Sequence, residues 1–233
     1  MKQKIEKWQR WIDRIEDQVK VVMMYRSFND QYVAIVNANP DLPPSNAFLS
    51  YFRAIYADGA AMAIRRQATT HRDSISLRRL LEELVEYPTL ISRAWTRELY
   101  EQPLPSGHTY GTGMAHFLAD STFKQYADAS GDFLDVSLLQ ADLDQLGTQT
   151  AFVVQLTDRA IAHDDAGGVR LDAPVTFDGL DAAIVCLERL VRKYIVLLTG
   201  RSFSSLTPID QTNARSVFYI PWIRTRGGIE KHP

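Results

Sequence analysis

Residues 4–23 read KIEKWQRWIDRIEDQVKVVM, and this stretch decides the fold class. Its apolar side chains return every three or four residues, which is the period of an α-helix with one buried face. The same spacing continues to about residue 37, and Pro40 then ends it because proline cannot continue a helix interior. The stripe consists of Ile5, Trp8, Ile12, Ile15, Val19, Val22, Val33 and Val36. It predicts a long amphipathic helix that packs against other helices.

Helical spacing returns along most of the remaining chain, and no alternating strand pattern interrupts it. The segments are residues 45–69, 76–87, 88–99, 114–126, 136–163 and 177–199. Gly200 stands where a helix C-cap is expected, and the only extended candidates are residues 169–171 and 217–220. We therefore predict an all-α fold, a single-domain bundle of about five main helices over residues 1–200. Residues 201–233 are expected to form an irregular C-terminal extension packed on this domain.

Composition sets limits on the class of protein. The chain has 233 residues, is 45% hydrophobic and has a formal net charge of −2, so it can build a core but does not have the strongly basic balance of a general nucleic-acid coat. The charged N-terminal residues do not resemble a secretory signal, and no apolar run is long enough for a membrane span. The single cysteine, Cys186, excludes an internal disulfide and is expected to be buried as a small apolar side chain. We expect a cytoplasmic protein with no membrane partner.

The candidate catalytic residues close the segment 136–163, in the sequence TDRAIAH of residues 157–163. Arg159 and His163 are four residues apart, so on a helix both project from one face. Arginine binds a phosphate with two parallel hydrogen bonds, whereas histidine exchanges a proton near neutral pH. Together they are sufficient for metal-free RNA cleavage. The alternative is that both side chains face solvent and interact with the negative end of the helix dipole.

Positive charge gathers around the turn near residues 69–76. The residues are Arg65, Arg66, His71, Arg72, Arg78 and Arg79. We expect the five arginines to bind nucleic-acid phosphates; the alternative is that they are solvated or paired with glutamates. His108 and His116 lack further ligands at zinc spacing, so no metal is predicted, and no motif indicates a cofactor.

A second stripe on the segment 136–163 leaves two interpretations open. It consists of Gln145, Gln149, Phe152, Leu156, Arg159 and His163. Phe152 and Leu156 are apolar, and a solvated face would not need them. They either form the interface of a homodimer or pack against a neighbouring helix of the same chain.

Three further pieces of the chain resemble a known family. They are Ser76-Leu77-Arg78-Arg79-Leu80-Leu81, Ala162-His163-Asp164, and Tyr194 to Gly200 followed by VFYIPW at residues 217–222. Together they resemble the HEPN-like helical proteins, and among them the abortive-infection branch, over nearly the whole chain. The resemblance implies a homodimer that cleaves RNA without metal, in bacterial defence or beside an antitoxin partner. His163 would assist proton transfer, Arg159 would stabilise the charged phosphorane, and Asp158 would be the polar residue of the motif.

The motif departs from the family pattern at one position, because Thr157 stands where the arginine is usual. This leaves three functions open. The first is a metal-independent endoribonuclease, and the second is a degenerate dimeric module that binds or regulates without cleaving. The third is a structural adaptor, in which Arg159 and His163 would form ion pairs with Asp158, Asp164 or Asp165.

Overall fold

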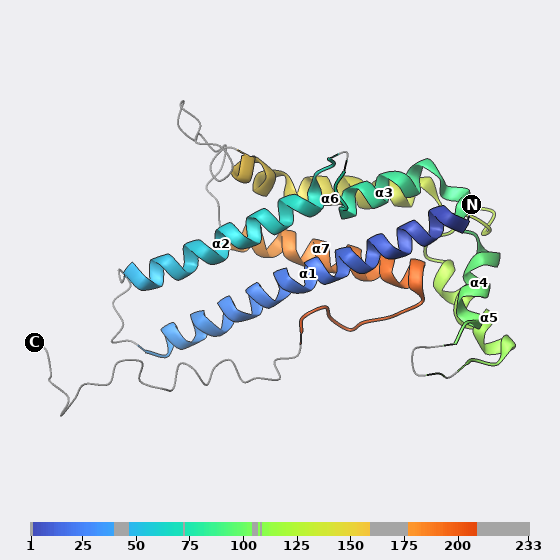
Figure 1. Ribbon diagram of the computed structural model, residues 1–233, viewed down its shortest axis with the longest axis horizontal. Helices are drawn as coiled ribbons and strands as arrows, with labels where there is room; N and C mark the ends of the chain where they lie inside the picture. Colours follow the sequence, from blue (N-terminus) through green and yellow to red (C-terminus); the bar gives the residue numbers. More distant parts are fainter. Residues whose placement is uncertain are drawn as a thin grey trace, which may run out of the picture.

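The computed structural model describes residues 2–39, 47–71, 73–103, 107, 109–158 and 177–208. Every named element in these ranges is helical, which confirms the predicted all-α class (Figure 1). The elements are α1 (Lys2–Asn37), α2 (Ala47–Ala68), α3 (Leu77–Glu86), the 3-10 turn η1 (Pro88–Leu90), α4 (Arg93–Glu101), α5 (Thr112–Phe123), α6 (Val136–Leu156) and α7 (Phe177–Thr199). None of these helices has both the length and the apolar character needed to cross a membrane.

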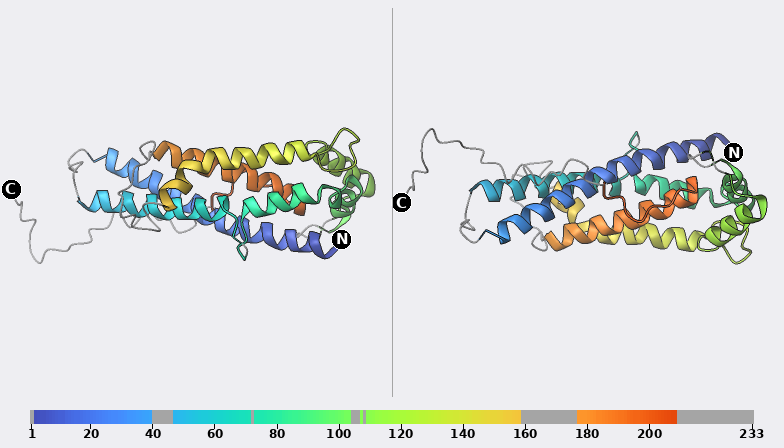
Figure 2. Two further views of the ribbon diagram at one scale, coloured as in Figure 1. Left: turned by 90° about the horizontal axis from the view of Figure 1, so that it is seen from above. Right: turned by 90° about the horizontal axis from the view of Figure 1, so that it is seen from below.

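The predicted number of about five main helices is not exact, because the described residues contain seven α-helices. α1, α2, α3, α6 and α7 pack along one another, whereas α4 and α5 pack mainly on each other at one end of the bundle (Figure 2). Pro88 forms the separate turn η1 instead of the first turn of α4. α4 therefore begins only at Arg93, where the Ser92 hydroxyl caps it by accepting a hydrogen bond from the Trp95 backbone N–H.

The helices share one core, and α1 and α7 contribute most of its buried side chains. Trp8, Ile12 and Ile15 of α1 are fully buried, as are Leu187 and Leu190 of α7. Cys186 is only 5% exposed, which confirms its predicted burial. Gly200 has φ +68°, so it ends α7 in the left-handed conformation that glycine adopts without strain.

A buried polar network joins α6 to α7. The Asp142 carboxylate is 6% exposed as a residue and accepts a hydrogen bond from the Tyr194 hydroxyl at 2.7 Å and another from the Lys193 ammonium. The Tyr126 hydroxyl donates to the Lys193 carbonyl at 2.7 Å. Burial, and then the neighbouring Asp142 charge, raise the pKa of Tyr194, so its hydroxyl stays protonated and acts as a donor. These polar groups are therefore satisfied inside an otherwise apolar layer.

The stripe with Phe152 and Leu156 packs within the molecule. Both side chains are partly buried against the core. A Cβ placed on Gly179 of α7 would lie 2.7 Å from the Phe152 ring, so the ring fills the space beside that glycine. Internal packing therefore explains these two side chains, and they give no support to a dimer interface on α6.

Residues 201–208 lie against α1 and α7. Arg201 forms an ion pair with Glu16 at 2.9 Å, and the Arg192 side chain donates to the Phe203 carbonyl at 2.7 Å. Leu206 is 2% exposed, and its backbone N–H donates to the Glu188 carboxylate at 2.8 Å. The remainder of the predicted extension, with residues 217–220, and the candidate 169–171 lie outside the described residues.

Glu83 ties α3 to α1, and we expect this contact to depend on pH. Its carboxylate accepts hydrogen bonds of 2.7 Å from both Lys7 and Trp8. Burial alone would raise the pKa of Glu83, but these two hydrogen bonds outweigh it and hold the pKa below its usual value. A carboxyl with a lowered pKa stabilises the fold above its unfolded pKa, and that stabilisation is lost as pH falls through the folded pKa.

Glu83→Gln should therefore reduce the free energy of unfolding by about 1 kcal/mol at pH 7. Urea denaturation should show the difference from wild type shrinking below about pH 4.3, the usual pKa of glutamate. A difference in the free energy of unfolding that stays constant between pH 7 and pH 3 would contradict the negative charge assigned to Glu83.

Candidate functional site

The described part of the TDRAIAH motif is Thr157 and Asp158, which follow α6 in a wider, π-type turn. Thr157 is fully buried, and its hydroxyl donates to the carbonyls of Val153 and Val154 at 2.7 and 3.0 Å. The side chain at the position that aligns with the family's arginine therefore points into the interior, where it binds backbone carbonyls of the last turn of α6. Arg159 and His163 lie outside the described residues.

Asp158 forms an ion pair with Arg65, in the last turn of α2. The Arg65 Nε donates to the Asp158 carboxylate at 2.6 Å, and the two side chains are 26% and 45% exposed. α2 and α6 pack against each other, which brings together residues 93 positions apart in sequence. The structure thus joins one expected catalytic residue to one expected phosphate-binding residue. Because an ion pair this exposed is worth about 1 kcal/mol or less, Arg65 can exchange the carboxylate for a phosphate at little cost.

An open cleft of about 420 Å³ lies near this pair, between the end of α2, α3 and α6. Arg78 lines the cleft and forms an ion pair of 2.9 Å with Glu82, with each side chain 37% exposed. Val154 lies on the α6 wall of the cleft, four residues, or about one helical turn, before Asp158. The cleft therefore runs along α6 from Gly147, beside which the Arg78 guanidinium lies, toward the end that carries the Arg65–Asp158 pair. We call Arg65, Asp158, Arg78 and this cleft the α6-end site.

Two of the other expected phosphate-binding arginines, Arg66 and Arg79, face elsewhere. Arg66 is exposed on the side of α2 that faces α1, where it lines a smaller groove with Gln18 and Met62. The Arg79 side chain donates to the Ser74 carbonyl at 2.9 Å and lies over the Trp11 ring at 4.8 Å. Arg72 lies outside the described residues. Adjacent helix positions differ by about 100° in direction, so one run of charge is divided among different faces.

One contact of this site was not predicted, and a second is an arginine–glutamate pair of the kind that the alternative expected. The Arg65–Asp158 pair has no sequence signal, because only the packing of α2 on α6 creates it. The Arg78–Glu82 pair did have one, since a separation of four residues places opposite charges side by side on a helix. Glu82 also accepts a hydrogen bond of 3.0 Å from the Thr70 hydroxyl. In the part of the chain that the structure describes, no three histidine, cysteine, aspartate or glutamate side chains are grouped so as to hold a metal ion.

An all-helical bundle with a polar motif at the end of a long helix is the arrangement that the resemblance to HEPN-like proteins implied. The model of the AbiU2 family, one of the HEPN families, matches residues 5–217. This match covers most of the chain, and the chain belongs to this family of abortive-infection-associated proteins. Comparisons with curated proteins and with solved structures gave no match.

Proposed function

We propose that this protein is a metal-independent endoribonuclease of the HEPN type. It acts as a homodimer in bacterial defence or in a toxin–antitoxin pair, with RNA as substrate and an antitoxin as partner. Family membership supports the defence role. The observation that carries the proposal is the Arg65–Asp158 ion pair at the end of α6, beside an open cleft that a second arginine lines.

In the proposed reaction, His163 takes the proton from a ribose 2′-hydroxyl. The 2′-oxygen forms a bond to the adjacent phosphorus, the bond from phosphorus to the 5′-oxygen breaks, and that oxygen receives a proton from water. Arg159 and Arg65 stabilise the negative charge that develops on the phosphorane oxygens. Arg65 supplies, from α2, the second guanidinium that the buried Thr157 cannot supply.

The test is cleavage of single-stranded RNA in the presence of a chelator. We expect products that end in a 2′,3′-cyclic phosphate and a 5′-hydroxyl. Arg65→Lys and Arg159→Lys should each lower kcat/KM by roughly 10- to 100-fold, because an ammonium keeps the charge but loses the two-point grip on phosphate. Arg79→Lys is the matched control, since Arg79 is held by Ser74 and Trp11, and it should leave cleavage unchanged. Equal losses in Arg65→Lys and Arg79→Lys would contradict a specific role for Arg65.

The alternative is a degenerate dimeric module that binds RNA without cleaving it. The burial of Thr157 favours it, because the usual motif arginine has no place at that position. Wild-type protein would then leave RNA intact with or without magnesium but retard it in a gel, and Arg65→Lys and Arg78→Lys would weaken this binding. Thr157→Arg would not restore the motif, because the fully buried site would force a guanidinium into the packed interior.

A further inference from the structure

The outer side of α2 and the adjoining side of α1 expose large apolar side chains. On α2, Phe48 is 49% exposed, Tyr51 63% and Ile55 51%. On α1, Tyr25 is 38% and Phe28 41% exposed. The C-terminal part of α1 and the N-terminal part of α2 lie at the end of the bundle opposite α4 and α5 (Figure 2). Single exposed apolar residues are ordinary, but a contiguous group of them marks an interaction surface.

The exposed residues of α2 follow the spacing of a coiled-coil seam. Phe48, Tyr51, Ile55, Asp58 and Met62 are separated by three, four, three and four residues and are all exposed. We call these five residues the α2 seam. Such a 3–4 alternation keeps one face of a helix toward a partner helix. The seam is about 21 Å long at about 1.5 Å per residue, which is two heptads.

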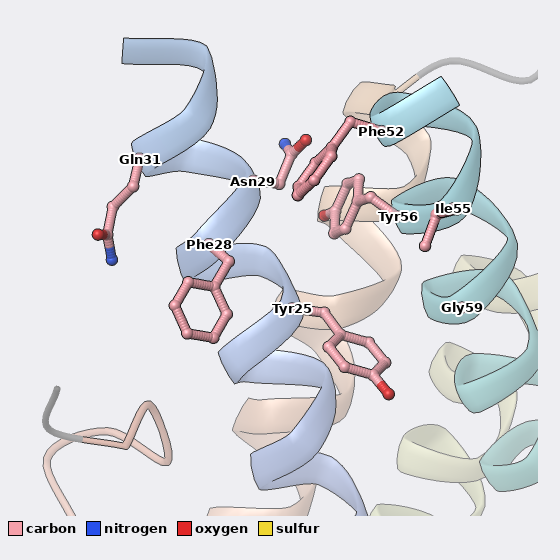
Figure 3. A pocket seen from close by; sticks show the side chains of 8 residues that line it. All are labelled: Tyr25, Phe28, Asn29, Gln31, Phe52, Ile55, Tyr56 and Gly59. Atoms are coloured by element: carbon pink, nitrogen blue, oxygen red, sulfur yellow. The ribbon is translucent and has the colours of Figure 1, made fainter. Parts of the chain in front are cut away.

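A cavity of about 320 Å³ lies beside the seam, between α1 and α2. Figure 3 shows Tyr25, Phe28 and Asn29 of α1 near Phe52, Ile55 and Tyr56 of α2 around it. Gly59 contributes no side chain, and a Cβ there would meet the Tyr25 ring at 3.5 Å. The cavity is therefore lined largely by aromatic side chains and lies next to the exposed side chains of the α2 seam.

We infer that a second copy of this chain packs its α2 antiparallel on this α2, about a twofold axis at Ile55. The register carries the inference, because reversing the helix about Ile55 places Phe48 opposite Met62, Tyr51 opposite Gly59 and Asp58 opposite Phe52. The protruding Tyr51 of each copy thus faces the cavity beside Gly59 of the other. A twofold interface requires a patch that is complementary to itself, and the exposed Tyr51 opposite the cavity beside Gly59 meets this requirement in both directions.

The inference rests on the homodimer of the proposed function and assigns it a surface other than the α6 stripe. Its tests measure mass and cross-linking, so they can fail independently of RNA cleavage. They use the full-length protein. Among the described residues the one cysteine, Cys186, is 5% exposed and should contribute little background.

The sharpest test is Ile55→Cys, because a residue on the twofold axis lies opposite itself. Packed helices have axes about 8–10 Å apart and Cα atoms about 2.3 Å from each axis, so facing Cα atoms are roughly 3.4–5.4 Å apart. The upper part of this range overlaps the Cα separation of about 4.4–6.8 Å that a disulfide requires. Under mild oxidation, Ile55→Cys should become mainly a covalent dimer on a non-reducing gel. Phe117→Cys, on α5 and 68% exposed, is the matched control and should remain mainly uncross-linked.

The register has its own test. Phe48→Cys mixed with Met62→Cys should give more covalent dimer than either variant alone. Equal cross-linking of Ile55→Cys and Phe117→Cys would overturn the inference, and so would a mixture that cross-links no better than its components.

Oligomeric state gives a second readout. Wild type should sediment as a dimer, and Ile55→Asp should raise the dimer dissociation constant at least about 30-fold, as expected for a central apolar residue of an interface. Its melting temperature should change little in the monomer, because Ile55 is 51% exposed. A monomeric wild type, or an Ile55→Asp variant that dimerises normally, overturns the inference. In those cases residues 209–233 of the same chain, or an RNA base, become the candidates for covering the seam.

Discussion

Replacement of His163 by alanine is expected to abolish RNA cleavage, with kcat falling by about 10²–10⁴-fold, the usual contribution of general acid–base catalysis. The side chain is the only group in residues 157–163 that exchanges a proton near neutral pH. Without it, the 2′-hydroxyl would remain protonated and nucleophilic attack would be slow. Cleavage of a fluorescent single-stranded RNA in the presence of a chelator measures the effect.

The matched control is His116→Ala. His116 lies on α5, with its ring 2.8 Å from the Glu101 carboxylate, and its side chain is 40% exposed. Its loss removes an imidazole elsewhere on the bundle and should leave cleavage unchanged. Persistent cleavage in His163→Ala, or a requirement for magnesium in wild type, would refute the mechanism.

Asp142→Asn should reduce the free energy of unfolding by about 3 kcal/mol, toward the lower end for a broken buried ion pair. The Asp142 side chain is 8% exposed and accepts hydrogen bonds from both Lys193 and Tyr194. An amide has no negative charge, so the Lys193 ammonium would remain partly buried without a counter-ion. The value lies toward the lower end because the Lys193 side chain retains 22% exposure. Chemical denaturation monitored by circular dichroism would measure the loss.

A triple variant separates charge burial from packing. Asp142→Leu, Lys193→Met and Tyr194→Phe together remove the carboxylate and both of its side-chain donors while keeping the volume similar. Because such apolar replacements of buried ion pairs are often neutral or stabilising, this variant should be more stable than Asp142→Asn. A triple variant that is less stable than Asp142→Asn would show that the network stabilises the fold through more than satisfying its own charges.

The proposed dimer and the proposed site share one helix. Met62 ends the α2 seam, and Arg65, which pairs with Asp158, follows three residues later. A second copy on the seam would therefore lie close to the α6-end site. Loss of dimerisation in Ile55→Asp should consequently lower RNA cleavage as well, although Ile55 lies about 15 Å along the helix from Arg65 at about 1.5 Å per residue.

The amphipathic pattern of the sequence was sufficient to predict the helices themselves. A helix with a continuous apolar stripe is stable only when that stripe is buried. The residues from Ile5 to Val22 therefore specify α1 without reference to any particular tertiary contact. The end of α7 at Gly200 follows similarly from local chemistry, since glycine adopts positive φ without strain. The pattern also located α4 and α5, with 9 and 12 residues, but it did not show that they pack mainly on each other at one end of the bundle.

Which side chains meet was decided only by the tertiary structure. In the sequence, Phe152 was equally compatible with a dimer interface and with internal packing. In the structure its ring packs beside Gly179 of α7. Arg65 and Arg66 are neighbours in sequence, yet one pairs with Asp158 on α6 and the other faces α1. Helical periodicity fixes the direction of each side chain around its own axis, but the rotation and register of neighbouring helices depend on how all their faces pack at once. The sequence by itself therefore determined the helical class and the candidate motif, and packing determined the neighbours of Asp158.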